Sequence, residues 1–145
     1  MKKTLKLVTI FFISLNLVSS ALAENSFFEK GKIKYNEKKY EESKFLFQRS
    51  IVFKPKDQNS YLYLAKIYKL EGNNREEEKN INTVLLLDPK NEEANYILME
   101  IELKKSNYLK VNDLIENFSK ICDKLCDKKN LILKSLKNLE PKNES

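Results

Sequence analysis

The chain has 145 residues, of which 27 are basic and 21 acidic, and it contains no histidine. Ser-His-Asp and Cys-His nucleophile activation are therefore excluded, and two isolated glycines exclude a glycine-rich phosphate loop. Adjacent acids such as Glu41 and Glu42 are typical of helix starts, where the helix dipole favours them. We expect no enzyme activity, no cofactor and no metal site.

Residues 1–23 have the pattern of a cleavable signal peptide. Three lysines precede an apolar run from Leu7 to Val18, and Ala21 and Ala23 supply small residues for cleavage. The run is shorter than the roughly 20 residues that span a bilayer, although a retained anchor stays the alternative. We expect an exported protein, located in a bacterial periplasm, whose mature chain starts at Glu24.

The charged residues of the remaining chain indicate which partners to expect. Lysines and glutamates interleave in KYNEKKYEESK (34–44) and NNREEEKN (73–80), which is typical of solvated helix faces. Such mixing makes no basic stripe that could follow phosphates, so no nucleic acid partner is expected. Contact with an anionic membrane surface would rest only on the lysines of the segment 128–137.

Helices are expected to dominate the mature chain, because two glycines and three prolines leave little turn chemistry for β-hairpins. Apolar residues recur at helical spacing, every third or fourth position, in successive blocks. Asp57 and Asn91 are predicted to cap the helices that follow them. Asn74 and Glu77 are predicted to form a capping box that opens another helix.

Two segments of the chain repeat one pattern. FKPKDQNSYLYLAKIY (53–68) returns as LDPKNEEANYILMEIE (87–102), which aligns Pro55 with Pro89 and Leu64 with Leu98. A fixed period of about 34 residues is typical of stacked helical hairpins.

The repeating columns resemble the tetratricopeptide repeat (TPR), a helix-turn-helix unit of about 34 residues. Gly31 and Ala65 match its small position, Gly72 its turn glycine, and Tyr40 and Tyr108 the aromatic that opens its second helix. The sequence also departs from the pattern: Glu77 stands where the family has a small apolar residue, and Asp123 stands in place of a third proline. Three further positions do not match the family's small or aromatic residues: Asn74, Asn95 and Met99.

The resemblance implies an all-α fold, a right-handed α-solenoid of three repeats with a C-terminal capping helix. The expected segments are the repeats 24–57, 58–91 and 92–125, the capping helix 126–139 and a disordered tail 140–145. Because each helix pair leaves an apolar face that a neighbour must cover, the last repeat needs a cap. Four apolar residues at helical spacing are expected to form the inward face of that helix: Ile132, Leu133, Leu136 and Leu139.

The resemblance also implies a concave groove lined by the first helix of each repeat. Aromatic rings beside lysines and amides suit an extended peptide or a partner helix; the alternative is that the rings only complete packing between helices. The candidate residues for binding a protein or peptide partner are Phe28, Lys32, Tyr35, Asn36, Asn59, Leu62, Lys66, Lys69, Tyr96, Glu100 and Leu103.

Cys122 and Cys126 lie close together in KICDKLCDK. In an exported protein they are candidates for a structural disulfide, which requires a turn rather than an unbroken helix. Two free buried thiols, or a redox or metal pair, are the alternatives. A redox pair would be expected in a strand-helix setting that this chain lacks, and two thiolates are too few for a closed zinc site.

The resulting hypothesis is an exported TPR adaptor that binds another protein in its groove and supports assembly or stability of an envelope or secretion complex. The alternative is a structural subunit that stacks on other helical proteins through the ends of its repeats. No residue in the sequence selects the partner, the process or the oligomeric state.

Overall fold

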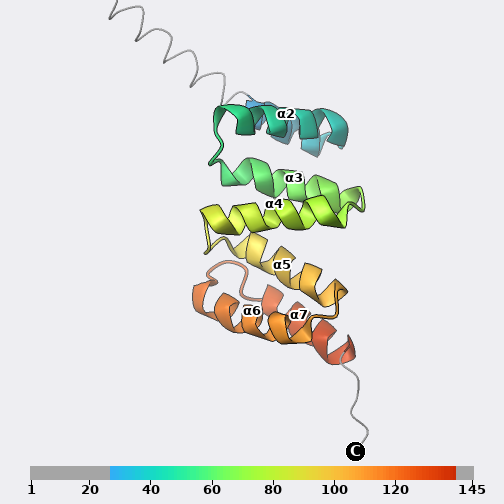
Figure 1. The fold of residues 1–145 in the computed structure, drawn as a ribbon, viewed down its shortest axis with the longest axis vertical. Coiled ribbons are helices and arrows are strands. Elements are labelled where there is room, and N and C mark those ends of the chain that lie inside the picture. Colours follow the sequence, from blue (N-terminus) through green and yellow to red (C-terminus); the bar gives the residue numbers. More distant parts are fainter. Residues whose placement is uncertain (1–26, 140–145) are drawn as a thin grey trace, which may run out of the picture. The chain divides into compact units, whose positions relative to one another are not determined.

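The computed structural model describes residues 27–139, so the predicted signal peptide (1–23) and tail (140–145) lie outside the described residues. The chain divides into two compact units, unit 1 (Met1–Ser60) and unit 2 (Tyr61–Ser145), with the boundary in the first turn of a helix. Every regular element in the described part is a helix (Figure 1). The predicted all-α fold class is therefore confirmed.

The helices recur at the period read from the sequence. Equivalent helices start one period apart: Tyr40, Asn74 and Tyr108 open one set, and Gln58 and Glu92 open the other. The helices are α2 (Tyr40–Phe53), α3 (Gln58–Leu70), α4 (Asn74–Leu87), α5 (Glu92–Lys104), α6 (Tyr108–Ile121) and α7 (Lys128–Leu139), and residues 27–36 before α2 are also helical (Figure 1).

The turn inside each helix pair uses one residue with a left-handed backbone. Lys38, Gly72 and Ser106 have φ values of 60°, 71° and 58°, and they too are separated by one period of the repeat. Glycine adopts this conformation without steric cost, whereas a side chain at that position is disfavoured by roughly 1 kcal/mol. The turn geometry is thus kept in all three pairs, although only one of them has the favoured residue.

In unit 1, helix 27–36 packs closely against α2 at Gly31. A Cβ atom at this position would lie 2.8 Å from Cε1 of the fully buried Phe47, closer than two such carbons can approach. The Oγ atom of Ser43 donates a hydrogen bond to the Gly31 carbonyl oxygen at 2.9 Å. The small residue at position 31 therefore lets the two helices touch.

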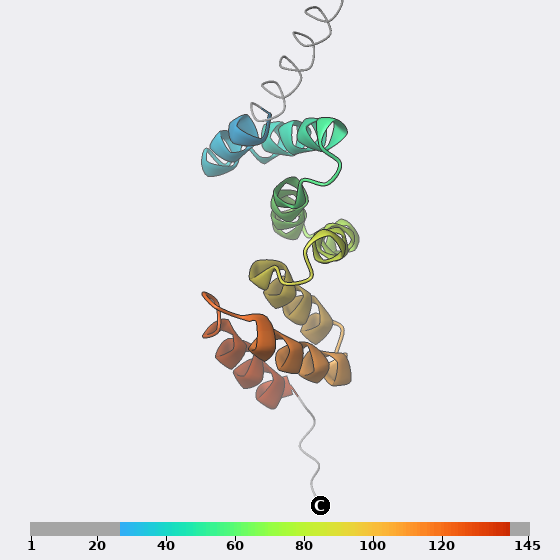
Figure 2. The same cartoon turned by 90° about the vertical axis from the view of Figure 1, so that its left-hand side faces the viewer.

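Unit 2 has two hydrophobic clusters that share α5. The first joins α3, α4 and α5 through residues such as Ala65, Val84 and Leu98. The second joins α5, α6 and α7 and includes Phe118 and Ile132. Figure 2 shows α7 lying beside α6.

The inward face of α7 is narrower than the sequence predicted, because Leu133 (40%) and Leu139 (52%) are exposed. Ile132 and Leu136 are buried against the second cluster, whereas Leu131 is 51% exposed. Within unit 2, α7 therefore covers apolar surface that α5 and α6 would otherwise expose to water.

Two of the predicted helix caps are confirmed and one is wrong. Asp57 accepts a hydrogen bond from Asn59 N (3.2 Å), and Asn91 accepts one from Ala94 N (3.0 Å). The cap of α4 lies one position before the predicted one, because Asn73 accepts the bond from Glu76 N at 3.2 Å. Glu77 therefore does not complete a capping box, and its side chain is buried instead.

Candidate functional site

The candidate groove residues of unit 1 lie on helix 27–36 and at the start of α3. The Phe28 ring lies 5.7 Å from the Phe47 ring, and the Tyr35 ring lies 5.6 Å from the Tyr40 ring. Lys32 extends over Phe28, with Nζ 5.4 Å from the ring centroid. Phe28 and Tyr35 thus complete the packing on α2 while remaining partly exposed. Asn36 and Asn59 are both exposed.

The candidate residues of unit 2 differ in their burial. Leu62 and Leu103 belong to the two hydrophobic clusters and offer a partner little surface. Lys66, Lys69, Tyr96 and Glu100 retain exposed side-chain surface. The polar and aromatic members, rather than the two leucines, form the accessible part of the predicted groove.

Ion pairs join the exposed faces of α3 and α5. Lys69 Nζ lies 2.6 Å from Glu100 Oε2, and Lys66 Nζ lies 2.8 Å from Glu93 Oε1. Exposed pairs of this kind add at most about 1 kcal/mol each to stability. These pairs restrict the positions of the lysine and glutamate side chains. The charged groups stay partly exposed and could bind the backbone of a partner peptide.

A shallow hollow of about 240 Å³ lies between α5 and α7. Tyr96, Glu100 and Leu103 line it from α5, and Leu131 and Leu139 are among the residues that line it from α7. Three of the predicted groove residues therefore meet at one concave surface within unit 2. Sequence columns did not indicate that α7 would supply the opposite wall.

Tyr96 is the central ring of this hollow. Burial, together with a hydrogen bond from its hydroxyl to Glu100 Oε1 (3.0 Å), raises the pKa of Tyr96 to about 12. Lys128 Nζ lies 5.6 Å from the ring centroid, within the range of a cation–π contact. Tyr96 is therefore held in place as a neutral phenol near neutral pH.

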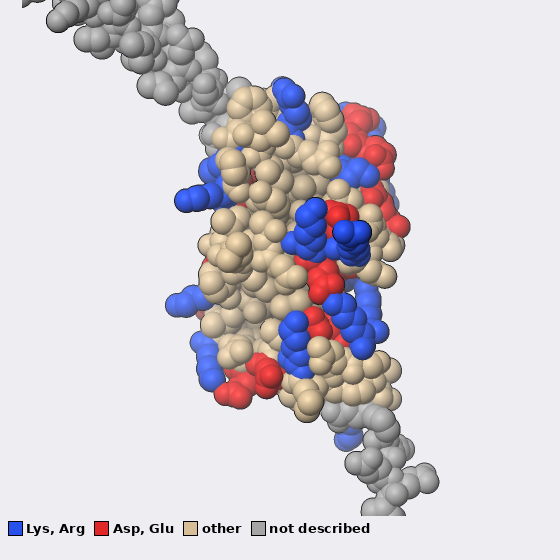
Figure 3. Space-filling model, viewed as in Figure 1, with Lys and Arg blue, Asp and Glu red and all other residues tan. Residues whose placement is uncertain are grey.

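Three observations on the described residues concern metal, membrane and charged surfaces. Between residues 27 and 139 there is no group of three or more cysteine, aspartate or glutamate side chains that could hold a metal ion. No helix among the described elements is long and apolar enough to cross a membrane. On the face drawn in Figure 3, basic and acidic side chains lie next to one another.

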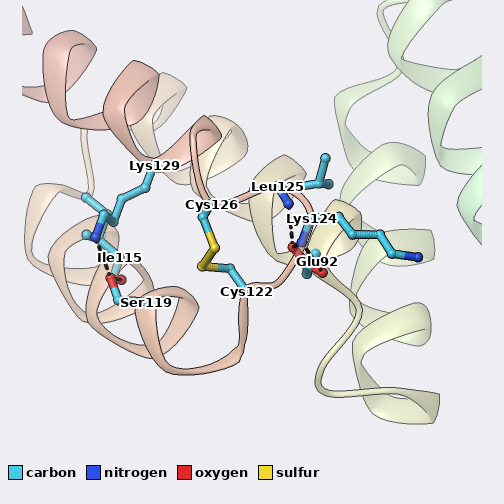
Figure 4. Close-up of a disulfide and its surroundings, with 8 residues drawn as sticks. All are labelled: Glu92, Ile115, Ser119, Cys122, Lys124, Leu125, Cys126 and Lys129. Carbon is cyan, nitrogen blue, oxygen red and sulfur yellow. Dashed lines mark hydrogen bonds between the residues drawn. A yellow bond between two sulfur atoms is a disulfide. The ribbon is translucent and has the colours of Figure 1, made fainter.

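The segment between α6 and α7 is closed by the two cysteines. The Sγ atoms of Cys122 and Cys126 are joined in a disulfide (Figure 4). Helix α6 ends at Ile121, and Cys122 has extended backbone angles (φ −68°, ψ 142°). The turn that a disulfide at this spacing requires is thus present.

Glu92, at the start of α5, holds this disulfide loop. Its carboxylate accepts hydrogen bonds from Leu125 N at 2.7 Å and from Lys124 N at 3.0 Å (Figure 4). The bond from Leu125 is the main cause that lowers the pKa of Glu92. The sequence pattern explains Glu92 by the helix dipole alone, since a contact with such a distant part of the chain leaves no local signal.

We expect the double substitution C122S/C126S to lower the free energy of unfolding by about 2 kcal/mol, because the bridge closes a short loop in the unfolded chain. Urea unfolding followed by circular dichroism measures this. Wild-type protein treated with a reductant is the matched control and should reach the stability of the variant. Unchanged unfolding on reduction, or two alkylated thiols in protein taken from its native compartment, would contradict a stabilising bridge.

Comparison with known proteins supports the fold but not a close relationship. No sequence-family profile matches the chain. No curated protein matches it either. The similarity lies in the three-dimensional structure alone.

Several solved TPR structures align with most of the chain. The Yersinia enterocolitica type III secretion chaperone SycD, in complex with a peptide of the translocator YopD, covers 79% of this chain and 92% of its own, with a TM-score of 0.70 and 16% identity. The Arabidopsis OM64 TPR domain covers 82% and 98%, with a TM-score of 0.71 and 16% identity.

A third match is the second TPR domain of human RPAP3 in complex with an HSP70 peptide. It covers 81% of this chain and 98% of its own, with a TM-score of 0.68 and 18% identity. The chain therefore has the TPR fold that the sequence columns predicted, with helices packed in pairs. At these identities the likeness establishes the fold and not the partner.

Proposed function

We propose that the protein is an exported TPR adaptor that binds a protein or peptide partner along the first helices of its repeats. The single observation that carries this proposal is the hollow between α5 and α7, where Tyr96, Glu100 and Leu103 meet. Apolar and aromatic surface edged by fixed charges suits a peptide, since rings supply contact area and polar groups orient the backbone.

The structural comparisons support this direction. The SycD and RPAP3 domains are each seen with a peptide of another protein, so this fold is suited to such ligands. In the chain itself, Lys66, Lys69 and Glu100 bring hydrogen-bonding groups to the exposed face of α3 and α5. An envelope or secretion complex is the setting we propose, because the sequence of residues 1–23 has the pattern of an export signal.

Polar substitution of the ring positions tests the proposal. We expect the triple substitution F28S/Y35S/Y96S to reduce recovery of the partner at least tenfold, because the loss of three rings removes most of the apolar contact area. The measurement is affinity capture from the native envelope, with circular dichroism to verify the fold of the variant.

The matched control for this experiment is L86S/L109S, on α4 and α6. Both leucines are more than 80% exposed and lie on second helices of their pairs. Their substitution should leave partner recovery unchanged. If the control loses the partner and the triple variant keeps it with an intact fold, the first helices are not the binding surface.

The second candidate function is a structural subunit that stacks through the end of its last repeat. Leu131, Leu133 and Leu139 on α7 are each at least 40% exposed, which leaves apolar surface beside the covered face. Stacking predicts a molar mass that rises with protein concentration, measured by light scattering. A constant monomer mass would leave the adaptor as the better account.

A further inference from the structure

One position of the repeat carries a buried charge that the equivalent positions lack. Ser43, Glu77 and Val111 occupy the same column of the repeat, and all three side chains are buried. Ser43 is satisfied by its hydrogen bond to the Gly31 carbonyl oxygen, and Val111 is apolar. Glu77 is only 1% exposed, and neither carboxylate oxygen has a hydrogen-bond partner in the described structure.

Another buried carboxylate, that of Glu102, does have hydrogen-bond partners. The lack of partners at Glu77 is therefore not a general feature of this fold. Glu102 accepts hydrogen bonds from Asn107 Nδ2 (3.0 Å) and Lys110 Nζ (2.9 Å). Burial by itself would raise the pKa of Glu102, but these bonds outweigh burial and lower it. For Glu77, burial outweighs the attraction of Lys104 and Lys69 and raises the pKa.

Glu77 faces a hollow of about 140 Å³ between α4 and α5, which is also lined by Asn74, Ile101, Lys104 and Lys105. At roughly 30 Å³ per water molecule the hollow has room for four or five waters, or for one small polar group. A buried unpaired carboxylate is costly unless a partner supplies both donors and positive charge. Water supplies the donors but not the charge.

The cations around the hollow are mostly engaged elsewhere. Lys69 of α3 pairs with Glu100 of α5, with 2.6 Å between Nζ and Oε2. Lys105, directly after α5, pairs with Glu78 of α4 at 2.5 Å. Lys104 is the cation that attracts the Glu77 carboxylate most strongly, but it makes no hydrogen bond to either oxygen.

We propose that Glu77 and Asn74 form an acceptor site for one ammonium or guanidinium group, supplied by a lysine or arginine of a protein partner or by a small free amine. Both oxygens are covered in this structure, so the Glu77 side chain must turn towards the hollow for such a group to donate to them. The charge of the group then compensates that of the carboxylate. The site lies beside the C-terminal end of α5 and shares Lys104 with the hollow between α5 and α7. Neither Glu77 nor Asn74 lines that second hollow, so either proposal can fail without the other.

The proposal gives Lys104 a specific role. Its ammonium has the same chemistry as the ligand, and Lys104 lines the hollow, so it competes for the carboxylate and repels an incoming cation. Removing the Lys104 charge should therefore strengthen binding, whereas removing the Glu77 charge should weaken it. A purely structural role for Glu77 would not link the two substitutions in this way.

The test is a titration of the purified ¹⁵N-labelled protein with ethylguanidinium, followed through the backbone amide signals of residues 74, 101 and 104. Tetramethylammonium at equal ionic strength is the control ligand, because it is a cation without N–H donors. We expect local saturable shifts with ethylguanidinium only. The affinity should fall about tenfold or more in E77Q and rise in K104Q.

Two results would overturn the site. If E77Q binds ethylguanidinium as tightly as the wild type, Glu77 is not the acceptor. If the wild type binds nothing and only K104Q does, Lys104 closes the hollow as an internal ion pair. A capped Gly-Arg-Gly peptide separates the two ligand sources: we expect it to compete with ethylguanidinium, whereas no competition would restrict the site to small free amines.

Discussion

Replacing both Ile132 and Leu136 with aspartate should lower the free energy of unfolding of the protein by at least about 4 kcal/mol. Both side chains are buried in the cluster that joins α5, α6 and α7. Truncation of one such side chain typically costs about 2–5 kcal/mol, and an unpaired charge in its place adds a desolvation cost. The variant should also expose the apolar faces of α5 and α6.

Urea unfolding followed by circular dichroism in the far ultraviolet measures the effect. L133D is the matched control, because Leu133 lies on the same helix and is 40% exposed. It should cost about 1 kcal/mol or less, since the new charge stays in water. If the double variant unfolds at the same urea concentration as L133D, α7 does not act as the cap of the last repeat.

Replacing Glu77 with valine should raise the free energy of unfolding at pH 7 by about 1–3 kcal/mol. The substitution gives position 77 the apolar residue that Val111 supplies in the next helix pair. It removes a buried carboxylate whose two oxygens lack hydrogen bonds, and an unsatisfied buried polar group costs free energy of this order. Most single substitutions destabilise a protein, so stabilisation by E77V would be an informative result.

The advantage of E77V should depend on pH in a defined direction. Because burial holds the pKa of Glu77 above its ordinary value of 4.5, the native state binds this proton more tightly than the unfolded chain does. The contribution of protonated Glu77 to the free energy of unfolding of the wild type is therefore fully present below the ordinary pKa. It is lost as the pH rises through the native pKa. The gap between E77V and the wild type should narrow as the pH falls towards the ordinary pKa.

S43V is the control for this second prediction. It places the same residue at the equivalent position of the first pair, but there it breaks the hydrogen bond to the Gly31 carbonyl oxygen. It should therefore destabilise, by about 1 kcal/mol. Stabilisation by both substitutions, or a gap for E77V that does not change with pH, would contradict an unsatisfied carboxylate at position 77.

The period of the sequence predicted the helices well, because it reflects a constraint that acts in every repeat. Pro55 and Pro89 follow helices at equivalent corners, and Tyr40 and Tyr108 open equivalent helices. Gly72 marks a left-handed turn that two other residues, a lysine and a serine, also adopt. The left-handed conformation of Lys38 and Ser106 could not be predicted from residue type. Only their spacing of one period from Gly72 indicates it.

The candidate site was harder to predict, since its contacts are made once and not repeated. Lys69 pairs with Glu100, and Glu92 binds the disulfide loop; both contacts join residues far apart in the sequence without a recurring column. Asn73 rather than Asn74 caps α4, a shift of one position that helical spacing does not resolve. The resemblance placed Glu77 at a small apolar position, but the sequence did not indicate that its carboxylate would be buried without a hydrogen-bond partner.

Site-specific photocrosslinking in cells that make the protein tests the central claim, that a partner binds the first-helix face of unit 2. Benzoylphenylalanine is placed at Tyr96, in the hollow between α5 and α7, and separately at the exposed Leu109 on α6. We expect a discrete crosslinked partner from position 96 and none from position 109. A partner crosslinked only from position 109 would contradict it.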